Sequence, residues 1–491
     1  MPGRGSQPLR LAMVATEART PAGRRTSLTV VSGLLGLSTL ATRLTTLVVM
    51  AFLTRGAGVE AVGFYGMATL SASFAAAALS LGLPTYLTRE VAAGTVSPPV
   101  VARIHSGRFA VLMAAAAVAY VLIGVLLPPE AQLAFFLIFV ASLLEQWNET
   151  AWVLIRGTRS AWAEPLTNTS TGLLLVGACA VDVWLLDGLT LHDAAVYFVT
   201  TSVLRSAAAV LVVRILPSLR ASRGVRSAHH IRLALPYFAS DLLGLFYFRG
   251  DVFILAFFVA AAEVGEYVSA AAIIGPAIQV AASMGIGALA YAAPQRASRA
   301  AQANDPLTVF QFFGLAGQGA AGVMFIGIPI ATVVLFGDQA GRIPELAMVL
   351  TLFLALRFAN FGLSAILLAR GRATSRLVVL VLSICGSVGL NLALDGRYGA
   401  YGAACAMVLN ELVVAGSMLW FLRIRELVWP VLMSVGSVAA AAWALAGLLA
   451  VMESAPASFT IGGVILALAT ARFVAQRRAA GQLRAATTED M

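Results

Sequence analysis

Long apolar segments follow one another along almost the whole chain, and they constrain its fold more than any other feature. An α-helix needs about 20 apolar residues to cross the hydrocarbon core of a bilayer, and fourteen segments reach that length. A water-soluble domain could not bury them, because 60% of the residues are hydrophobic and 11% are charged. The sequence therefore predicts an all-α polytopic membrane protein with about 14 transmembrane helices. These are expected at 28–53, 61–82, 107–128, 131–154, 165–186, 194–214, 232–258, 266–290, 308–335, 344–369, 375–394, 399–421, 428–451 and 457–475.

The arginines alternate from one side of these spans to the other, which predicts the topology. With the N-terminus inside, twenty-six arginines lie in cytoplasmic segments and three lie in outer loops, at Arg55, Arg342 and Arg397. Cytoplasmic loops of membrane proteins retain positive charge. We therefore expect a multi-pass protein of the plasma (inner) membrane with both termini in the cytoplasm. The net charge of +10 follows from this topology, so nucleic acid is not an expected partner.

Several kinds of chemistry are excluded by composition. All basic residues are arginine, so the chain has neither a GxxxxGK[ST] phosphate-binding loop nor a Schiff-base lysine. The three cysteines, Cys179, Cys385 and Cys405, lie far apart in apolar spans without metal-ligand spacing. The outer loops are too short for a catalytic domain. We therefore expect no metal, no cofactor and no enzymatic activity. A membrane polysaccharide polymerase or ligase is the less favoured alternative.

A repeated pattern indicates that the membrane region is duplicated. Aligning Gly63 with Gly265 also aligns Tyr65 with Tyr267, and each pair opens a predicted span after a short turn. Such repeats are typical of transporters built from two related helix bundles around a shared axis. The expected organisation is two pseudo-symmetric six-helix bundles around a central cavity, plus two extra C-terminal helices. The segments are a disordered cytoplasmic tail at 1–27, bundles at 28–214 and 232–422, a cytoplasmic linker at 215–231, two helices within 428–475 and a cytoplasmic tail at 476–491.

Four segments resemble one transporter family. They are LTRGAGVEAVGFYGMA, LGLPTYLTRE, AAEVGEYVSA and RYGAYGAACAMVLNE, which begin at residues 53, 81, 261 and 397. Together with the duplicated spans, they resemble the polysaccharide flippases. These form the polysaccharide-transporter branch of the multidrug/oligosaccharidyl-lipid/polysaccharide exporter superfamily. The resemblance covers about residues 28–422.

The resemblance implies a V-shaped pair of bundles whose cavity opens to one side of the membrane at a time. It implies that the cavity carries lipid-linked sugars across the inner membrane. The expected partners are a lipid-linked glycan and membrane lipids, and a polysaccharide polymerase or another pathway protein stays open. The alternative within the superfamily is a cation-coupled multidrug exporter, which would prefer an acidic cavity.

Four arginines lie deep in predicted spans, at Arg43, Arg205, Arg249 and Arg357. A charge there costs about 2.5–3.5 kcal/mol on insertion, so it usually faces a cavity or a partner. Arg43 and Arg249 lie in the first helix of each half, and we expect them to clamp the (pyro)phosphate headgroup of the substrate through bidentate hydrogen bonds. Arg205 and Arg357 are weaker candidates. The alternative is that each arginine pairs with an acidic neighbour, such as Asp241 for Arg249.

The acidic residues within spans are candidates for a coupling-ion site or for ion pairs in the cavity. They are Glu145, Glu149, Asp241, Asp251 and Glu411. Glu145 and Glu149 are four residues apart and share one helical face, so they could together hold a proton or cation. The alternative is that each forms a salt bridge to an arginine.

Overall fold

The structure is a computed structural model, and it describes residues 28–92, 94–156, 162–186, 188–212, 227–292 and 306–423. The elements in this part are all helical, as expected for an all-α protein. They are α1 (Leu28–Ser80), α2 (Leu83–Ala92), α3 (Pro98–Leu126), α4 (Pro129–Arg156), α5 (Ala163–Leu185), α6 (Leu191–Val212), α8 (Ser227–Leu255), α9 (Ala261–Ala292), α10 (Pro306–Phe336), η1 (Gly337–Ala340), α11 (Ile343–Ala369) and α12 (Ala373–Leu422). The predicted tails and the spans at 428–451 and 457–475 lie outside the described residues.

Two long helices, α1 and α12, are each broken by a glycine. Gly58 in α1 has φ 83° and Gly399 in α12 has φ 55°, values that favour glycine because it has no Cβ. The breaks fall at the junctions of predicted spans, so α1 contains the spans at 28–53 and 61–82, and α12 contains those at 375–394 and 399–421. Nine helices within the described residues are long and apolar enough to cross a membrane, α1 and α12 each counting once.

Some helices extend beyond the predicted spans. The inner segment at 83–106 contains the short helix α2, and α3 begins at Pro98 instead of near residue 107. Helix α8 begins at Ser227, inside the predicted linker. Hydropathy locates the apolar part of a helix, whereas backbone hydrogen bonding continues into the polar region beside it. The predicted boundaries were therefore too narrow at these ends.

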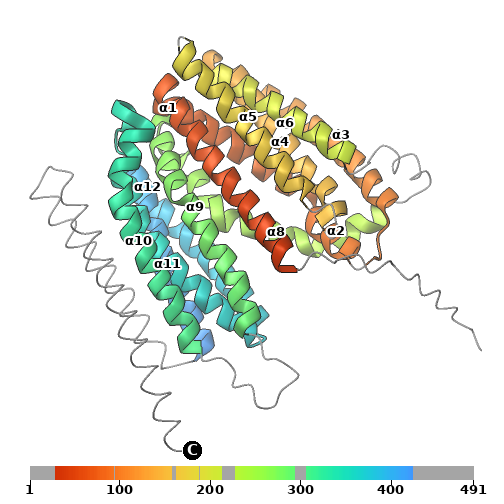
Figure 1. Ribbon diagram of the computed structural model, residues 1–491, viewed down its shortest axis with the longest axis vertical. Coiled ribbons are helices and arrows are strands. Elements are labelled where there is room, and N and C mark those ends of the chain that lie inside the picture. Colours follow the sequence, from red (N-terminus) through yellow and green to blue (C-terminus); the bar gives the residue numbers. More distant parts are fainter. Residues whose placement is uncertain are drawn as a thin grey trace, which may run out of the picture.

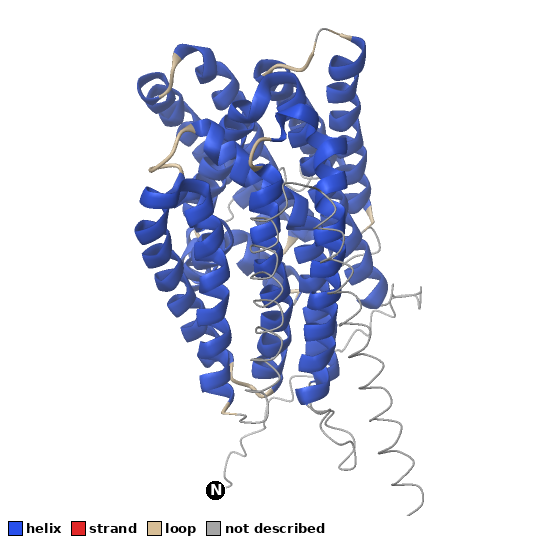
Figure 2. Ribbon diagram, turned by 90° about the vertical axis from the view of Figure 1, so that its left-hand side faces the viewer, coloured by secondary structure: helices blue, strands red, loops and turns tan. Residues whose placement is uncertain are grey.

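The helices form two packed groups (Figure 1). In the N-terminal half, α1 packs on α4 and α5, α3 on α4, and α6 on α4 and α5. In the C-terminal half, α11 packs on α9, α10 and α12, and α12 packs on α8. Most of the helices run roughly along the long axis of the molecule (Figure 2). The two groups meet chiefly where α1 packs against α9.

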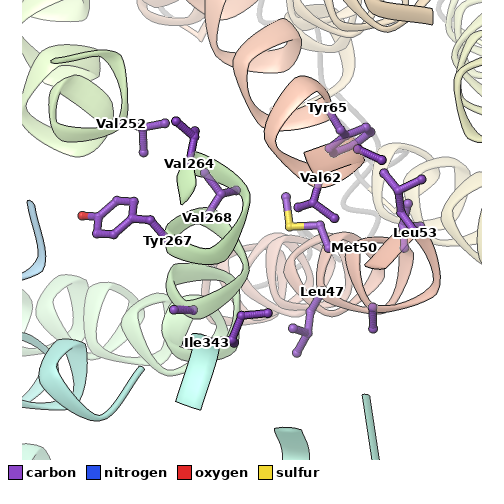
Figure 3. Packing of buried hydrophobic residues seen from close by; sticks show 14 of the residues in the cluster. Leu47, Met50, Leu53, Val62, Tyr65, Val252, Val264, Tyr267, Val268 and Ile343 are labelled. Carbon is purple, nitrogen blue, oxygen red and sulfur yellow. The ribbon is translucent and has the colours of Figure 1, made fainter. Parts of the chain in front are cut away.

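The contact between α1 and α9 is a close crossing of the two glycines aligned in the sequence. A Cβ on Gly63 would lie 1.8 Å from the Ala261 carbonyl oxygen, and one on Gly265 would lie 1.9 Å from the Val59 carbonyl oxygen. The contact is reciprocal, because each carbonyl belongs to the residue four positions before the other glycine. Around it lie buried side chains of both helices, including Tyr65 on α1 (Figure 3). The repeated positions therefore pack against each other at the junction of the two halves.

Candidate functional site

A cavity of about 680 Å³ lies beside this crossing, between the two halves. Helices α1, α4, α5 and α6 line it from the N-terminal half, and α8 and α9 contribute Arg249, Val252 and Val268. Its size is within the range of small-molecule binding sites. Its charged lining residues in the described part of the chain are Arg43, Glu145, Glu149, Arg156, Glu164, Arg205 and Arg249.

Arg43 and Arg249, the two arginines expected to face each other, both line this cavity. Arg43 comes from α1 and is exposed, whereas Arg249 comes from α8 and is half-buried. Their positive charges are close enough to interact. Within the described residues, neither guanidinium forms a hydrogen bond or an ion pair with another side chain. Two positive charges without an ion-pair partner among the described residues therefore face one space, and the Asp251 carboxylate interacts with the charge of Arg249 from outside the lining.

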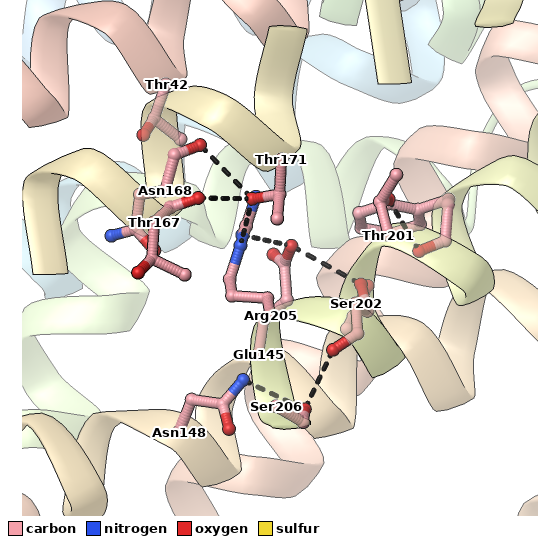
Figure 4. Close-up of polar contacts among 12 residues, drawn as sticks. Thr42, Glu145, Asn148, Thr167, Asn168, Thr171, Thr201, Ser202, Arg205 and Ser206 are labelled. Carbon is pink, nitrogen blue, oxygen red and sulfur yellow. Dashed lines mark hydrogen bonds and ion pairs between the residues drawn. The ribbon is translucent and has the colours of Figure 1, made fainter. Parts of the chain in front are cut away.

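Arg205 also lines the cavity, but it is paired. Its Nη1 lies 2.5 Å from Oε1 of Glu145, and its Nε donates to Oγ1 of Thr171 at 3.0 Å (Figure 4). Glu145 lies on α4, Thr171 on α5 and Arg205 on α6. The pair therefore connects three helices of the N-terminal half. Of the two alternatives for Arg205, the structure has the ion pair.

Glu149 and Glu164 share a second arginine at another part of the cavity wall. Nη2 of Arg156 lies 2.6 Å from Oε2 of Glu149 and 2.6 Å from Oε1 of Glu164. Glu145 and Glu149 thus have separate arginine partners, as in the salt-bridge alternative. The sequence reasoning missed Glu164, whose approach to Arg156 depends on how the ends of α4 and α5 lie relative to each other.

Arg357 and Glu411 lie elsewhere, in the C-terminal half. Nη1 of Arg357 is 2.5 Å from Oε1 of Glu411, and the two side chains are only 4% and 2% exposed. Asn360 donates from Nδ2 to Oε2 of Glu411 at 2.6 Å. Neither charged residue lines the large cavity, so Arg357 does not join Arg43 and Arg249 there. For Arg357, as for Arg205, the structure has the ion pair, which was the alternative to a role in binding. The carboxylate on the next helix compensates the charge of the buried arginine, and Nε of Arg357 is left without a hydrogen-bond partner.

The two remaining acidic candidates also lie away from the cavity lining. Asp251 accepts a hydrogen bond from the Tyr267 hydroxyl. Asp241 accepts one from Oγ1 of Thr85 on α2, at 2.9 Å. Asp241 therefore contacts the other half of the molecule and does not pair with Arg249, which was the expected alternative.

The two ion pairs occupy corresponding helices of the predicted repeat with their charges exchanged. In the N-terminal half, Glu145 is on α4 and Arg205 on α6. In the C-terminal half, Arg357 is on α11 and Glu411 on the second part of α12. An asparagine follows three residues after the α4 and α11 members. The N-terminal pair is 31% and 13% exposed, so it differs from the buried C-terminal pair in access as well as in sign.

An all-helical, multi-pass membrane protein with a positively charged cavity between two related helix groups has the architecture of a transporter. Residues 32–290, more than half of the chain, match the family described as "Polysaccharide biosynthesis protein". The chain belongs to this family. No curated protein sequence matches it.

Solved structures of low sequence identity share the fold. A lipid II flippase, MurJ, in an inward closed conformation is 11% identical, with 91% of this chain and 99% of that chain covered and a TM-score of 0.66. An inward-facing multidrug resistance transporter of the MATE family is 14% identical, with 83% and 98% covered and a TM-score of 0.56. A MOP superfamily transporter from Pyrococcus furiosus, described as having a binding pocket of reversed polarity, is 14% identical, with 83% and 96% covered and a TM-score of 0.54. At these identities the likeness is one of fold, and the chain has the fold of solved structures described as a lipid flippase and as multidrug transporters.

Proposed function

We propose that this protein is a flippase for an isoprenoid-(pyro)phosphate-linked sugar or oligosaccharide. It moves this lipid from the inner to the outer leaflet of the plasma membrane by alternating access, for cell-surface polysaccharide assembly. The observation that carries the proposal is the pair of unpaired arginines, Arg43 and Arg249, in one cavity between the halves. The family and its fold support the same substrate class.

The charges of the cavity favour a phosphate-bearing ligand over an organic cation. The three glutamates of the lining all have arginine partners, whereas Arg43 and Arg249 form no ion pair with a carboxylate of the described residues. Two like charges repel each other, and an anion between them removes that cost. Guanidinium groups match phosphate oxygens through two parallel hydrogen bonds. A headgroup with two phosphates offers one phosphate to each arginine.

In the proposed architecture, two six-helix bundles, at 28–214 and 232–422, rock against each other. The cytoplasmic linker at 215–231 joins them, two further helices lie within 428–475, and both tails are cytoplasmic. The crossing of Gly63 and Gly265 provides a pivot. At the predicted inner end, α2 of the first half contacts α8 of the second, through the hydrogen bond between Thr85 and Asp241. Opening toward the cytoplasm breaks this contact.

Transport into proteoliposomes tests the proposal, using a fluorescent polyprenyl-pyrophosphate glycan and the variants Arg43→Gln and Arg249→Gln. Each arginine loses charged hydrogen bonds of about 1.5–3 kcal/mol, so we expect roughly a 10- to 100-fold loss of flipping at low substrate concentration. Arg103→Gln is the matched control, because Arg103 is exposed on α3 and does not line the cavity.

One outcome would reject the proposed role of the two arginines, and two others would reject the flippase itself. Unchanged flipping by both cavity variants would mean that the arginines have only a structural role. Export of an organic cation without movement of the glycan lipid would indicate the multidrug exporter. A covalently extended or transferred glycan would indicate a polymerase or ligase.

A further inference from the structure

A second cavity, of about 370 Å³, lies wholly within the C-terminal half, between α8, α11 and α12. Helix α8 separates it from the large cavity. Arg249 and Val252 of α8 line the large cavity, while Tyr247 and Phe248 line the second one. The second cavity is therefore a separate space, and its size is within the range of ligand sites.

The charged lining residues of this second cavity are both arginines. They are Arg357 and Arg376, and no carboxylate of the described residues lines it. Arg357 is neutralised from behind by Glu411. Arg376 is exposed, and in the described part of the chain it has no hydrogen bond or ion pair through its side chain. The cavity therefore presents an uncompensated positive charge near its wall.

The rest of the lining is mostly apolar, with polar groups from Tyr247, Asn360, Ser364 and Ser383, and it is open at the side. Leu368, Leu380, Val414 and Met418 belong to the wall. Two further lining residues are exposed on the surface of the helices, Phe248 at 53% and Leu377 at 50%. Apolar side chains that are exposed on a membrane-spanning helix are expected to face lipid. A molecule can therefore enter from the bilayer without passing through water.

The positive charge lies at one end of this space. Arg376 is in the first turn of α12, which begins at Ala373, and the wall residue Leu368 is next to the C-terminal end of α11. Arg357 lies deeper, with its guanidinium carbon 4.3 Å from the Tyr247 ring centre and 4.9 Å from that of Phe248. The arrangement provides a charged group near the membrane surface and a mostly apolar space extending inward from it.

We infer that this second cavity binds a lipid with an anionic phosphate headgroup. The phosphate lies on Arg376, and the first part of the apolar chain lies among the aliphatic side chains of α11 and α12. Basic pockets between transmembrane helices on the cytoplasmic side bind acidic lipid headgroups in this way. The site differs from the proposed glycan cavity in position and lining, so lipid binding here can be measured without transport.

Native mass spectrometry of the purified full chain, titrated with defined lipids in detergent, tests the inference. The probes are phosphatidylglycerol, a polyprenyl phosphate, phosphatidylcholine and inorganic phosphate. Loss of one arginine at the surface weakens anionic lipid binding about fivefold, so Arg376→Gln is expected to raise the Kd for phosphatidylglycerol by that factor. Arg370→Gln is the control, because Arg370 is also exposed at this end and does not line the cavity.

A second variant tests the space itself. Gly244 lines the cavity, and a Cβ there would meet nothing within 4 Å, so Gly244→Leu can fill the cavity without a backbone clash. Gly416→Leu is its control, because that position is equally open and lies outside the lining. We expect Gly244→Leu to abolish retention of the lipid and Gly416→Leu to leave it unchanged.

The lipid panel distinguishes the sources of the phosphate. Tighter binding of phosphatidylglycerol than of the polyprenyl phosphate identifies a bulk membrane lipid, and the reverse order identifies an isoprenoid carrier; both support the site. Equal binding of phosphatidylcholine, competition by inorganic phosphate as strong as that by either lipid, or identical binding by Arg376→Gln and Arg370→Gln would overturn it.

Discussion

Replacement of Gly265 by alanine tests the close crossing of α1 and α9. The new Cβ would lie 1.9 Å from the Val59 carbonyl oxygen and 2.8 Å from the Gly63 amide nitrogen. Side-chain carbons essentially never approach other heavy atoms within 3.0 Å, so the two backbones must separate by more than 1 Å. Backbone atoms cannot rotate away as a side chain could. The strain therefore falls on the packing of the two halves.

The size of the effect follows from two opposing terms. Inserting a methyl group into a packed interface costs typically about 1–3 kcal/mol, and this contact belongs at the upper end of that range. Alanine in a helix is favoured over glycine by about 1 kcal/mol. We expect Gly265→Ala to destabilise the protein by about 2 kcal/mol. Gly63→Ala should have a similar effect, because the contact is reciprocal.

An unfolding titration in mixed micelles, followed by tryptophan fluorescence, measures these differences. Gly244→Ala is the control of the same chemistry, since a Cβ there meets nothing within 4 Å. It should be neutral or stabilising by up to about 1 kcal/mol. The two substitutions are therefore expected to shift the midpoint in opposite directions. Equal shifts for Gly265→Ala and Gly244→Ala would refute the close crossing.

Three further results are expected. Glu411→Leu leaves the Arg357 charge buried without a partner and should lower the free energy of unfolding by about 3–5 kcal/mol. Adding Arg357→Leu should recover most of that loss. If unfolding titrations find the double variant no more stable than the single one, the buried pair is contradicted. Glu145→Gln removes a negative charge from the large cavity and should tighten pyrophosphate binding about fivefold, or roughly 1 kcal/mol, as measured by calorimetry. The gain in affinity should be smaller at high salt. Unchanged affinity would count against an anion site. Burial lowers the pKa of the His230 imidazole, which precedes the membrane span and contacts the Tyr86 hydroxyl at 3.1 Å. The folded state therefore binds fewer protons than the unfolded one. The stability that the neutral His230 contributes is complete above about pH 6.5 and is lost as the pH falls through the lowered pKa. The difference in unfolding free energy between the wild type and His230→Gln should shrink between about pH 7.5 and pH 5.5, and a constant difference would contradict this expectation.

Features that repeat along the chain could be predicted from the sequence. The apolar spans located the helices between residues 28 and 422, and the alignment of Gly63 with Gly265 identified related positions. The placement of Arg43 and Arg249 in the first helix of each half was enough to expect them at one cavity. Each of these features depends on spacing within a segment or on the equivalence of two segments, which a sequence displays directly.

Features that depend on how separate helices meet could not be predicted. The sequence shows that Glu164 follows Arg156 by eight residues, but the arrangement of α4 and α5 decides that the two side chains touch. Five acidic residues and four arginines lay in predicted spans, and only the packing decided that Arg357 pairs with Glu411. The second cavity combines α8 with the consecutive helices α11 and α12, which lie far from α8 along the chain, and its lining residues form no motif. Alignment also could not show that equivalent glycines are in contact.

The exchanged charges of the two ion pairs affect how the helices find their partners during insertion. The halves are similar, so α6 could pack against α11 of the other half, or α4 against α12, in one chain or between two chains. Either error would place Arg205 beside Arg357, or Glu145 beside Glu411. Two like charges in hydrocarbon, each without its counter-ion, make such pairings costly. If both halves carried the pair with the same sign, a mismatched pairing would be electrostatically as good as the correct one. The reversal therefore lets a duplicated protein distinguish its own two copies while it assembles.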